Sequence, residues 1–98
     1  MHSADGHSES ISVRHDPAGS RFVVDLPGGQ AELIYGDFAE DVLDLEHTEI
    51  PPSGRGKGVG DALIRAALRY ARERGARVMA TCPYVRRWLL RHPDERPT

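Results

Sequence analysis

A run of glycines between residues 54 and 60 is the part of the sequence best suited to holding a ligand. Every second residue is a glycine in the run Gly54-Arg55-Gly56-Lys57-Gly58-Val59-Gly60, which leads into an Ala- and Arg-rich stretch. Glycines leave backbone N–H groups uncovered and adopt positive φ readily. The first N–H groups of a helix are unpaired and carry partial positive charge. With two basic side chains in the same turn, the run predicts a site for a phosphorylated ligand.

The spacing of these glycines narrows the class of ligand. A nucleoside triphosphate loop requires Gly-x-x-x-x-Gly-Lys-Ser/Thr, which no register of the segment supplies. The dinucleotide motif Gly-x-Gly-x-x-Gly also fails, because its last position never falls on a glycine. The pattern that fits is Arg/Gln-x-x-Gly-x-Gly/Ala, filled by Arg55, Gly58 and Gly60. A glycine-rich turn with no ligand is the alternative.

Cys82 is the second residue with a chemical signature. It ends a predicted strand and directly precedes Pro83, a residue favoured at the first position of a helix. Unpaired amides at a helix start stabilise a thiolate, so Cys82 is a candidate nucleophile. The alternative is a small buried apolar side chain. Tyr84 is a candidate general acid, or else packs against Trp88 one turn later.

Three candidate bases precede the glycines. Glu46, His47 and Glu49 fall on a predicted strand. Alternation along a strand places His47 on the same face as Leu43 and Leu45, opposite Glu46. A buried structural histidine and a catalytic one therefore both remain open.

The elements that must position these residues are predicted from periodicity and turn chemistry. Strands are expected at 11–16, 21–26, 30–35, 42–50 and 77–82, the first three forming an antiparallel meander. Gly36-Asp37 is expected to end the third strand. Helices are expected at 59–74 and 83–91, with Gly75 as a left-handed residue after the first. A strand–helix–strand unit makes strands four and five parallel, so the fold class is α/β with a mixed sheet.

Composition limits the kind of protein. The 98 residues, 39% hydrophobic and 29% charged, predict a disordered tail at 1–10 and one domain at 11–95, with a frayed end at 94–98. One cysteine excludes an internal disulfide framework and a cysteine-rich metal site, so a cytoplasmic protein without a metal is expected. The sequence has no secretory signal and no run near the ~20 apolar residues of a membrane helix, so no membrane contact is expected.

Charge is divided between the two halves of the chain. Residues 1–54 carry two basic and eleven acidic side chains, whereas 55–98 carry eleven basic and four acidic ones. Such a division suits a polyanionic ligand on one side and a cationic one on the other, although simple solvation of exposed helices also explains it. Nucleic acid binding is disfavoured, because only six aromatic residues are present and several fall at predicted core positions.

Four segments together resemble a known family. They are His47-Thr48-Glu49-Ile50-Pro51-Pro52, Arg55-Gly56-Lys57-Gly58-Val59-Gly60, Cys82-Pro83-Tyr84-Val85 and Arg91-His92-Pro93. In this order and at these separations they resemble the small YjdJ-type branch of the GNAT superfamily of N-acetyltransferases, over roughly residues 11–95. The resemblance implies a compact GNAT-like fold, in which parallel strands four and five splay apart, and acetyl-coenzyme A as the acetyl donor.

The resemblance also implies roles for particular residues. The pyrophosphate of coenzyme A would lie on the amides of residues 56–60, and the pantetheine would pair with the backbone of strand four. Cys82 corresponds to the residue regarded as the active-site cysteine of this branch, either accepting the acetyl group or protonating the leaving thiolate. The implied catalytic set is Cys82, His47 and Tyr84, and the implied cofactor-binding set is Glu49, Ile50, Arg55, Gly56, Lys57, Gly58, Val59 and Gly60.

Two functions follow from the residues and the resemblance. The first is an acetyl-coenzyme A-dependent N-acetyltransferase that acts on a primary amine of a small molecule or protein, as a monomer or weak dimer. The alternative is a module that binds coenzyme A or acyl-coenzyme A without turnover, because so short a chain leaves little for an acceptor pocket. The acceptor itself stays open.

Overall fold

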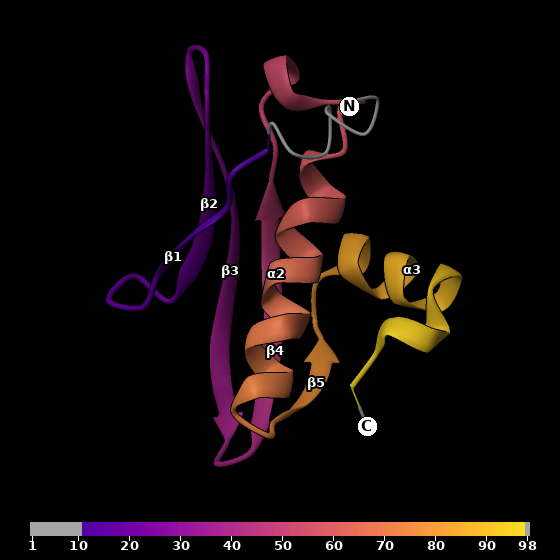
Figure 1. The fold of residues 1–98 in the computed structure, drawn as a ribbon. Coiled ribbons are helices and arrows are strands. Elements are labelled where there is room, and N and C mark those ends of the chain that lie inside the picture. Colours follow the sequence, from indigo (N-terminus) through magenta and orange to yellow (C-terminus); the bar gives the residue numbers. More distant parts are fainter. Residues whose placement is uncertain (1–10, 98) are drawn as a thin grey trace, which may run out of the picture.

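The computed structural model describes residues 11–97, so the predicted tail at 1–10 lies outside the described part. One sheet contains β1 (Arg14–Asp16), β2 (Arg21–Leu26), β3 (Gly29–Ala39), β4 (Val42–Glu49) and β5 (Arg77–Ala80), in that spatial order. The helices are α2 (Val59–Glu73) and α3 (Pro83–Arg91), and the short 3-10 helices are η1 (Pro52–Gly54) and η2 (Pro93–Glu95). Figure 1 shows α2 running along one face of the sheet, with α3 beside it near the β5 edge. No helix within residues 11–97 is long and apolar enough to cross a membrane.

The sheet topology confirms the predicted fold class. Neighbouring strands from β1 to β4 are antiparallel, whereas β4 and β5 are parallel. The helix α2 connects β4 to β5, as a parallel pair requires. The structure is therefore a mixed α/β sheet, an antiparallel meander followed by strand, helix, strand and helix.

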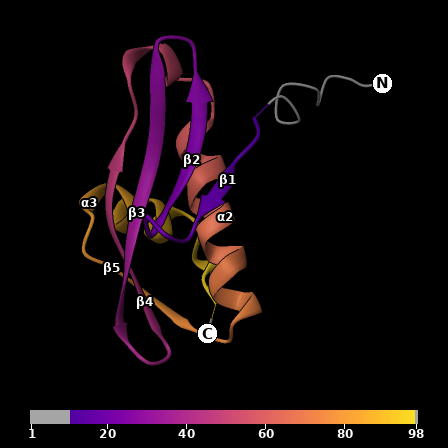
Figure 2. The same ribbon diagram turned by 90° about the vertical axis from the view of Figure 1, so that its left-hand side faces the viewer.

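The hydrophobic core lies between α2 and the face of the sheet that it covers. Its fully buried side chains include Leu33, Leu43 and Leu45 from the strands and Leu63, Ile64 and Leu68 from α2, and α3 adds Val85 and Trp88. Each such side chain contributes on the order of 1.5–3 kcal/mol relative to exposure. Figure 2 shows α2 alongside the sheet, and η1 lies between the end of β4 and the start of this helix.

The strand β3 is longer than the sequence predicts. It continues past Gly36 and Asp37 to Ala39, because both residues pair with β4. Gly36 lies next to the carboxylate of Glu46, the flexible end of an exposed side chain. The expected end of the strand at Gly36-Asp37 is therefore wrong: cross-strand pairing overrides the turn propensity.

The first and fifth strands are shorter than predicted. Pairing between β1 and β2 starts only at Arg14, opposite Val23, so 11–13 run beside the sheet without a strand assignment. Residue 81 leaves the β4–β5 ladder because its amide donates to the side chain of Asp44 instead. The helix α3 begins at Pro83 and α2 is followed by Gly75 with φ of +69°, both as predicted.

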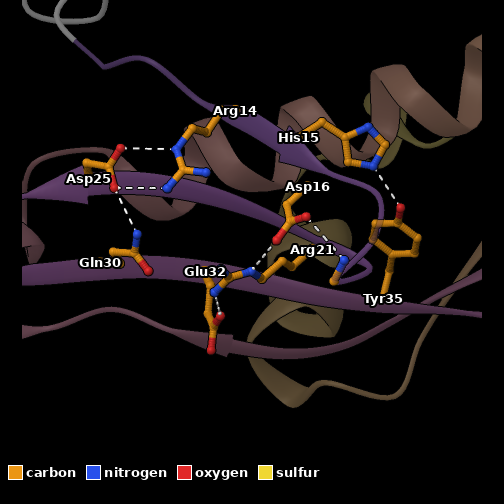
Figure 3. Close-up of polar contacts among 9 residues, drawn as sticks. Arg14, His15, Asp16, Arg21, Asp25, Gln30, Glu32 and Tyr35 are labelled. Atoms are coloured by element: carbon orange, nitrogen blue, oxygen red, sulfur yellow. Dashed lines mark hydrogen bonds and ion pairs between the residues drawn. The ribbon is translucent and has the colours of Figure 1, made fainter.

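The face of the sheet away from α2 carries charged side chains in pairs. Figure 3 shows the Arg14 guanidinium on the carboxylate of Asp25, and Arg21 between Asp16 and Glu32. The three ion pairs have N–O distances of 2.8 to 3.1 Å. Val23, which lies among them by register, is 0% exposed although it is not part of the main core.

The residues after α3 are held by side-chain contacts. Glu95 forms two hydrogen bonds with Arg65, each 2.9 Å long, and Arg96 donates to the carbonyl of Val78 at 2.9 Å. The expectation of a frayed end from residue 94 onward is therefore wrong for Glu95 and Arg96.

Candidate active site

The parallel strands β4 and β5 separate halfway along β4. Their register ends at Leu45 opposite Ala80, and the last bond between the two segments runs from the Cys82 N–H to the Leu45 carbonyl at 3.1 Å. Beyond it the chain turns into α3, whereas β4 continues to Glu49. Within the described residues, this last stretch of β4 pairs with β3 alone, so the predicted splay is confirmed.

Asp44 explains why β5 stops at this point. It accepts hydrogen bonds from the N–H of Thr81 at 2.9 Å and from its hydroxyl at 2.7 Å, and it is only 8% exposed. The guanidinium of Arg86 donates hydrogen bonds to the carbonyls of Ala80 and Thr81, at 3.2 and 3.1 Å. Sequence reasoning missed Asp44, although a carboxylate in the middle of an apolar strand is a signal for a buried hydrogen-bonding role.

The glycine loop provides a hollow next to the end of β4. Gly56 and Gly58 have φ of +74° and +80°, and Gly58 is the N-cap of α2. The hollow has a volume of about 270 Å³ and is lined by Ile50, Gly54, Arg55, Gly56, Gly58, Gly60, Asp61 and Tyr84. Five of the predicted cofactor-binding residues thus meet at one place, together with the predicted general acid Tyr84.

The other three predicted cofactor-binding residues lie elsewhere. Lys57 lines two larger hollows, of about 750 and 570 Å³, on the side of the loop toward residues 11–13. Val59 is 2% exposed and belongs to the core, so only its backbone can reach a ligand. Glu49 is exposed at the end of β4. The loop therefore separates Arg55 on one side from Lys57 on the other.

Arg55 has a backbone partner. Its Nε donates to the carbonyl of Ile50 at 3.2 Å, which closes the turn between β4 and the loop. A ligand that pairs with β4 as an added strand would find this carbonyl already accepting a hydrogen bond. The N–H groups of the loop are better placed to bind a ligand than this carbonyl. Gly56 and Gly58 have positive φ, which other residues rarely adopt, and such a turn can direct successive N–H groups toward an anion such as a diphosphate.

Tyr84 reaches from α3 to the start of α2. Its hydroxyl lies so close to Gly60 that a Cβ at that position would clash with it. Burial, followed by the negative charge of Asp61, raises the pKa of the Tyr84 phenol. The hydroxyl therefore keeps its proton at neutral pH and can act as a hydrogen-bond donor in the hollow.

Cys82 lies at the N-cap of α3 as predicted, and its neighbour is Thr48. The side chain of Cys82 is 5% exposed, and its Sγ is 3.6 Å from the Thr48 Oγ1. This contact joins the part of β4 beyond its pairing with β5 to the start of α3. Sequence reasoning quoted Thr48 only as part of a motif and gave it no role.

His47 does not lie where strand alternation predicts. Tyr35 pairs with Leu45 and Ile34 with His47, so Glu46 is an extra residue that forms a β-bulge. The bulge removes His47 from the face of Leu45. Its side chain is 58% exposed, with Nε2 3.2 Å from Glu49 Oε1. The alternative of a buried structural histidine is therefore wrong, and Thr48 takes the position beside Cys82.

Residues 11–97 contain no group of three or more His, Cys, Asp or Glu side chains that could hold a metal ion.

Several known proteins are similar to this chain in sequence or in fold. A family model described as GCN5-related N-acetyl-transferase matches residues 21–97. Protein NATD1 of Bos taurus is 35% identical over 85 residues, which cover 85% of this chain and 75% of the relative. Protein NATD1 of Danio rerio is 30% identical over 88 residues, covering 88% and 80%. The solution NMR structure of a GCN5-like protein from Staphylococcus aureus aligns with a TM-score of 0.66 at 22% identity, over 86% of this chain and 82% of that one, which shows a likeness of fold.

A mixed sheet whose two parallel strands diverge beside a glycine-rich helix start defines an acetyltransferase-type domain. The splay, the loop and the cysteine at the helix start occur together here within residues that the family model covers. The chain belongs to the GCN5-related N-acetyltransferase family, which confirms the resemblance seen in its motifs.

Proposed function

We propose that this protein transfers an acetyl group from acetyl-coenzyme A to a primary amine of a small molecule or a protein. The observation that carries the proposal is the hollow between the glycine loop and Tyr84. It is bounded by Ile50, which follows the end of β4, and by a tyrosine two residues after Cys82. A ligand in this hollow would therefore lie at the outer end of the gap that opens after Leu45 and Ala80.

The residues that would hold the donor fit its chemistry. A diphosphate is stabilised by uncovered N–H groups at a helix start, which the backbone of Gly56–Gly60 supplies, and by the positive charge of Arg55. We expect the pantetheine to use the backbone of Glu49 and the N–H of Ile50, since the Ile50 carbonyl already accepts a hydrogen bond from Arg55. The donor itself supplies an activated thioester.

The remaining residues would move protons. Attack requires a neutral amine, so a base must accept a proton from its nitrogen. His47 and Glu49 are exposed, hydrogen-bonded to each other and near the end of β4, which suits them to this role. As the new C–N bond forms and the C–S bond breaks, the departing sulfur gains a proton, for which the hydroxyl of Tyr84 and the thiol of Cys82 are the candidate donors. In a variant of this route, the Sγ of Cys82 accepts the acetyl group first.

Thiol release from acetyl-coenzyme A tests the proposal directly. The native protein should release thiol in the presence of at least one member of a panel of amines and peptides, and Cys82→Ala should lower the rate about 100-fold or more. Intact mass after incubation with acetyl-coenzyme A alone distinguishes an acetylated Cys82 from direct transfer. Absence of turnover with every amine would contradict an enzymatic function.

A binding module is the second candidate, and the burial of Cys82 favours it. With 5% of its surface exposed, the thiol offers little access to an incoming acceptor. Such a module would bind coenzyme A, and its thermal stability would rise with ligand concentration by mass action, without thiol release. A thermal shift with coenzyme A in the absence of turnover therefore separates the two functions.

A further inference from the structure

Two large apolar side chains within residues 11–97 are exposed to solvent, and each lies among charges of one sign. Phe38 is 68% exposed and lies near the end of β3, whereas Leu90 is 77% exposed and lies in the last turn of α3. A single exposed apolar residue needs no explanation by itself. The charges that surround these two side chains are what distinguish them.

The first of these surfaces is the turn between β3 and β4. The pairing of the two strands shifts between Asp37 and Ala39, which leaves Phe38 as the extra residue of a β-bulge, a feature that can turn a side chain away from the sheet. Glu40 and Asp41 form the turn that follows, and both are exposed. Within the described residues neither belongs to an ion pair. We call Phe38, Glu40 and Asp41 the acidic tip.

The second surface is the outer side of α3. Arg86 and Arg87 precede Leu90 by four and three residues, so they are its neighbours on the helix surface, and Arg91 follows it directly. All three arginines are exposed, and none forms an ion pair with another described residue. Of the three, Arg86 donates to the carbonyls of residues 80 and 81. We call Leu90 and its three arginines the basic face.

The acidic tip and the basic face are complementary to each other. Each places an apolar side chain next to charges, and the charges are opposite in sign, so that contact would bury both apolar groups and pair the charges. The two surfaces do not cover each other within one chain, because Phe38 and Leu90 are both largely exposed. Figure 1 shows the turn between β3 and β4 at the lower end of the sheet and α3 further up, beyond β5. The partner that fits both surfaces is a second copy of the chain.

We propose that two copies of this chain associate about a twofold axis, with the acidic tip of each on the basic face of the other. A twofold pair forms this contact twice, and neither copy then leaves one of its surfaces open. A foreign acidic segment would satisfy only the basic face, and a foreign basic segment only the acidic tip. The proposal goes beyond acetyl transfer and does not depend on it, because neither surface includes Cys82, Tyr84 or the glycine loop.

The association should be weak and sensitive to salt. A short turn and one side of a nine-residue helix are expected to bury less than the ~1,600 Å² of a standard interface, and interfaces of that size begin at micromolar affinity. We therefore expect a dissociation constant on the order of 100 µM. Because the charged side chains of both surfaces are exposed, added salt screens their attraction and should weaken the pair further.

Sedimentation velocity of the whole chain over a range of concentrations tests the association. The native protein should shift from monomer to dimer as its concentration rises. Arg87→Glu or Glu40→Arg should each weaken the pair about tenfold or more, because each places like charges opposite one another. Arg69→Glu reverses the same charge on the exposed side of α2, outside both surfaces, and should leave the association unchanged.

An equimolar mixture of Arg87→Glu and Glu40→Arg gives a sharper result. In a mixed pair, native Glu40 of one variant meets native Arg87 of the other, and the two introduced charges are also opposite in sign. The mixture should therefore associate about as tightly as the native protein, although neither variant does so alone. Phe38→Ser should weaken the native pair without any change of charge, because it removes an apolar group that the contact buries.

Three results would overturn the proposal. The first is a native protein that stays monomeric well above the expected dissociation constant, and the second is an association that neither charge reversal weakens. The third is a mixture that stays monomeric although the unfolding midpoints show both variants to be folded. Assemblies larger than dimers would contradict the twofold axis. None of these results bears on acetyl transfer, which thiol release measures separately.

Discussion

Thr48 and Cys82 are 34 residues apart in the sequence, yet their side chains touch at the point where the parallel strands separate. The contact exists because the bulge at Glu46 shifts the pleat of β4 by one residue, so that Thr48 rather than His47 faces α3. A single extra residue in a strand thus decides which side chain accompanies the thiol.

The replacement Thr48→Val tests whether this hydroxyl matters for chemistry. Valine has nearly the same shape, so packing is preserved and only the contact with sulfur is lost. We expect acetyl transfer to slow about tenfold, while the free energy of unfolding changes by less than ~1 kcal/mol.

Thr81→Val is the matched control, because it removes a threonine hydroxyl from the other side of the strand gap. Its hydroxyl bonds Asp44 at 2.7 Å, and Asp44 is almost fully buried. Here we expect the free energy of unfolding to fall by about 1–3 kcal/mol. Equal effects of the two replacements on stability, with none on transfer, would refute a chemical role for Thr48.

At the level of elements, α2 and α3 meet at their starts, where Gly60 and Tyr84 touch. The absence of a side chain at Gly60 allows the tyrosine hydroxyl into the hollow. The indole N–H of Trp88, one turn after Tyr84 in α3, donates to the carboxylate of Asp61, the residue after Gly60, and this bond holds the same two helices together. The mutual position of loop and cysteine therefore depends on this interface.

A double-mutant cycle measures how tightly Gly60 and Tyr84 are coupled. Gly60→Ala alone should lower the free energy of unfolding by about 1–3 kcal/mol, since the new methyl group overlaps the phenol. Combined with Tyr84→Ala, the same change should cost much less, giving an interaction free energy of at least about 1 kcal/mol in urea titrations. Strict additivity would mean that the two residues do not touch in solution.

The bounds of some helices and strands were predicted correctly from the sequence and those of others were not, and the difference has a physical reason. The bounds of β2 and α3 match because turn residues and Pro83 mark them locally. The extension of β3 and the bulge at Glu46 were not predicted, since both depend on which residue of β4 faces which residue of β3. Strand register is a property of two segments, and a one-dimensional pattern does not contain it.

The site shows the same division. The glycine loop, Cys82 and Tyr84 were singled out because each belongs to a pattern of consecutive residues, and their roles stay predictions. Thr48 and Asp44 were not, because their significance lies in contacts with residues 82 and 81, more than thirty positions away. The separation of Lys57 from Arg55 also escaped prediction, since neighbours in a loop of alternating glycines can point into different hollows.

For the molecule as a whole, the β1 edge of the sheet contains a histidine among aromatic rings. His15 stacks on Phe22 with a centroid distance of 4.3 Å, bonds the Tyr35 hydroxyl at 2.7 Å and meets Tyr70 edge-on. Glu73 and Arg69 from α2 line the hollow beside it, and Asp16 follows it in β1. Burial lowers the pKa of His15, against a smaller opposite effect of Asp16.

Stability should therefore depend on pH through His15. A lowered pKa in the folded state means that the unfolded chain binds the proton more readily, so unfolding takes up protons near the ordinary histidine pKa of about 6.5. We expect the free energy of unfolding to be higher at pH 7.5 than at pH 5.5, because it falls as the pH drops below the ordinary histidine pKa of about 6.5. Urea titrations at pH 7.5 and 5.5 check this direction.

One variant assigns the effect. His15→Gln should flatten the dependence between these pH values. The carboxylates with lowered pKa values, among them Asp16 and Glu95, act at lower pH and do not overlap this window. An unchanged slope in His15→Gln would contradict the prediction.

The charged side chains on the face of the sheet away from α2 also shield a buried residue, Val23, from water. By register Val23 lies beside Arg14 and Glu32, and Arg21 precedes it by two residues on the same face. We infer that the aliphatic stems of the two arginines keep water from its side chain. Arg21→Met should thus retain more stability than Arg21→Ala, by roughly 1 kcal/mol in denaturant titrations, although both lose the same charge. If the two variants are equally stable, the guanidinium rather than the hydrocarbon stem keeps that valine dry.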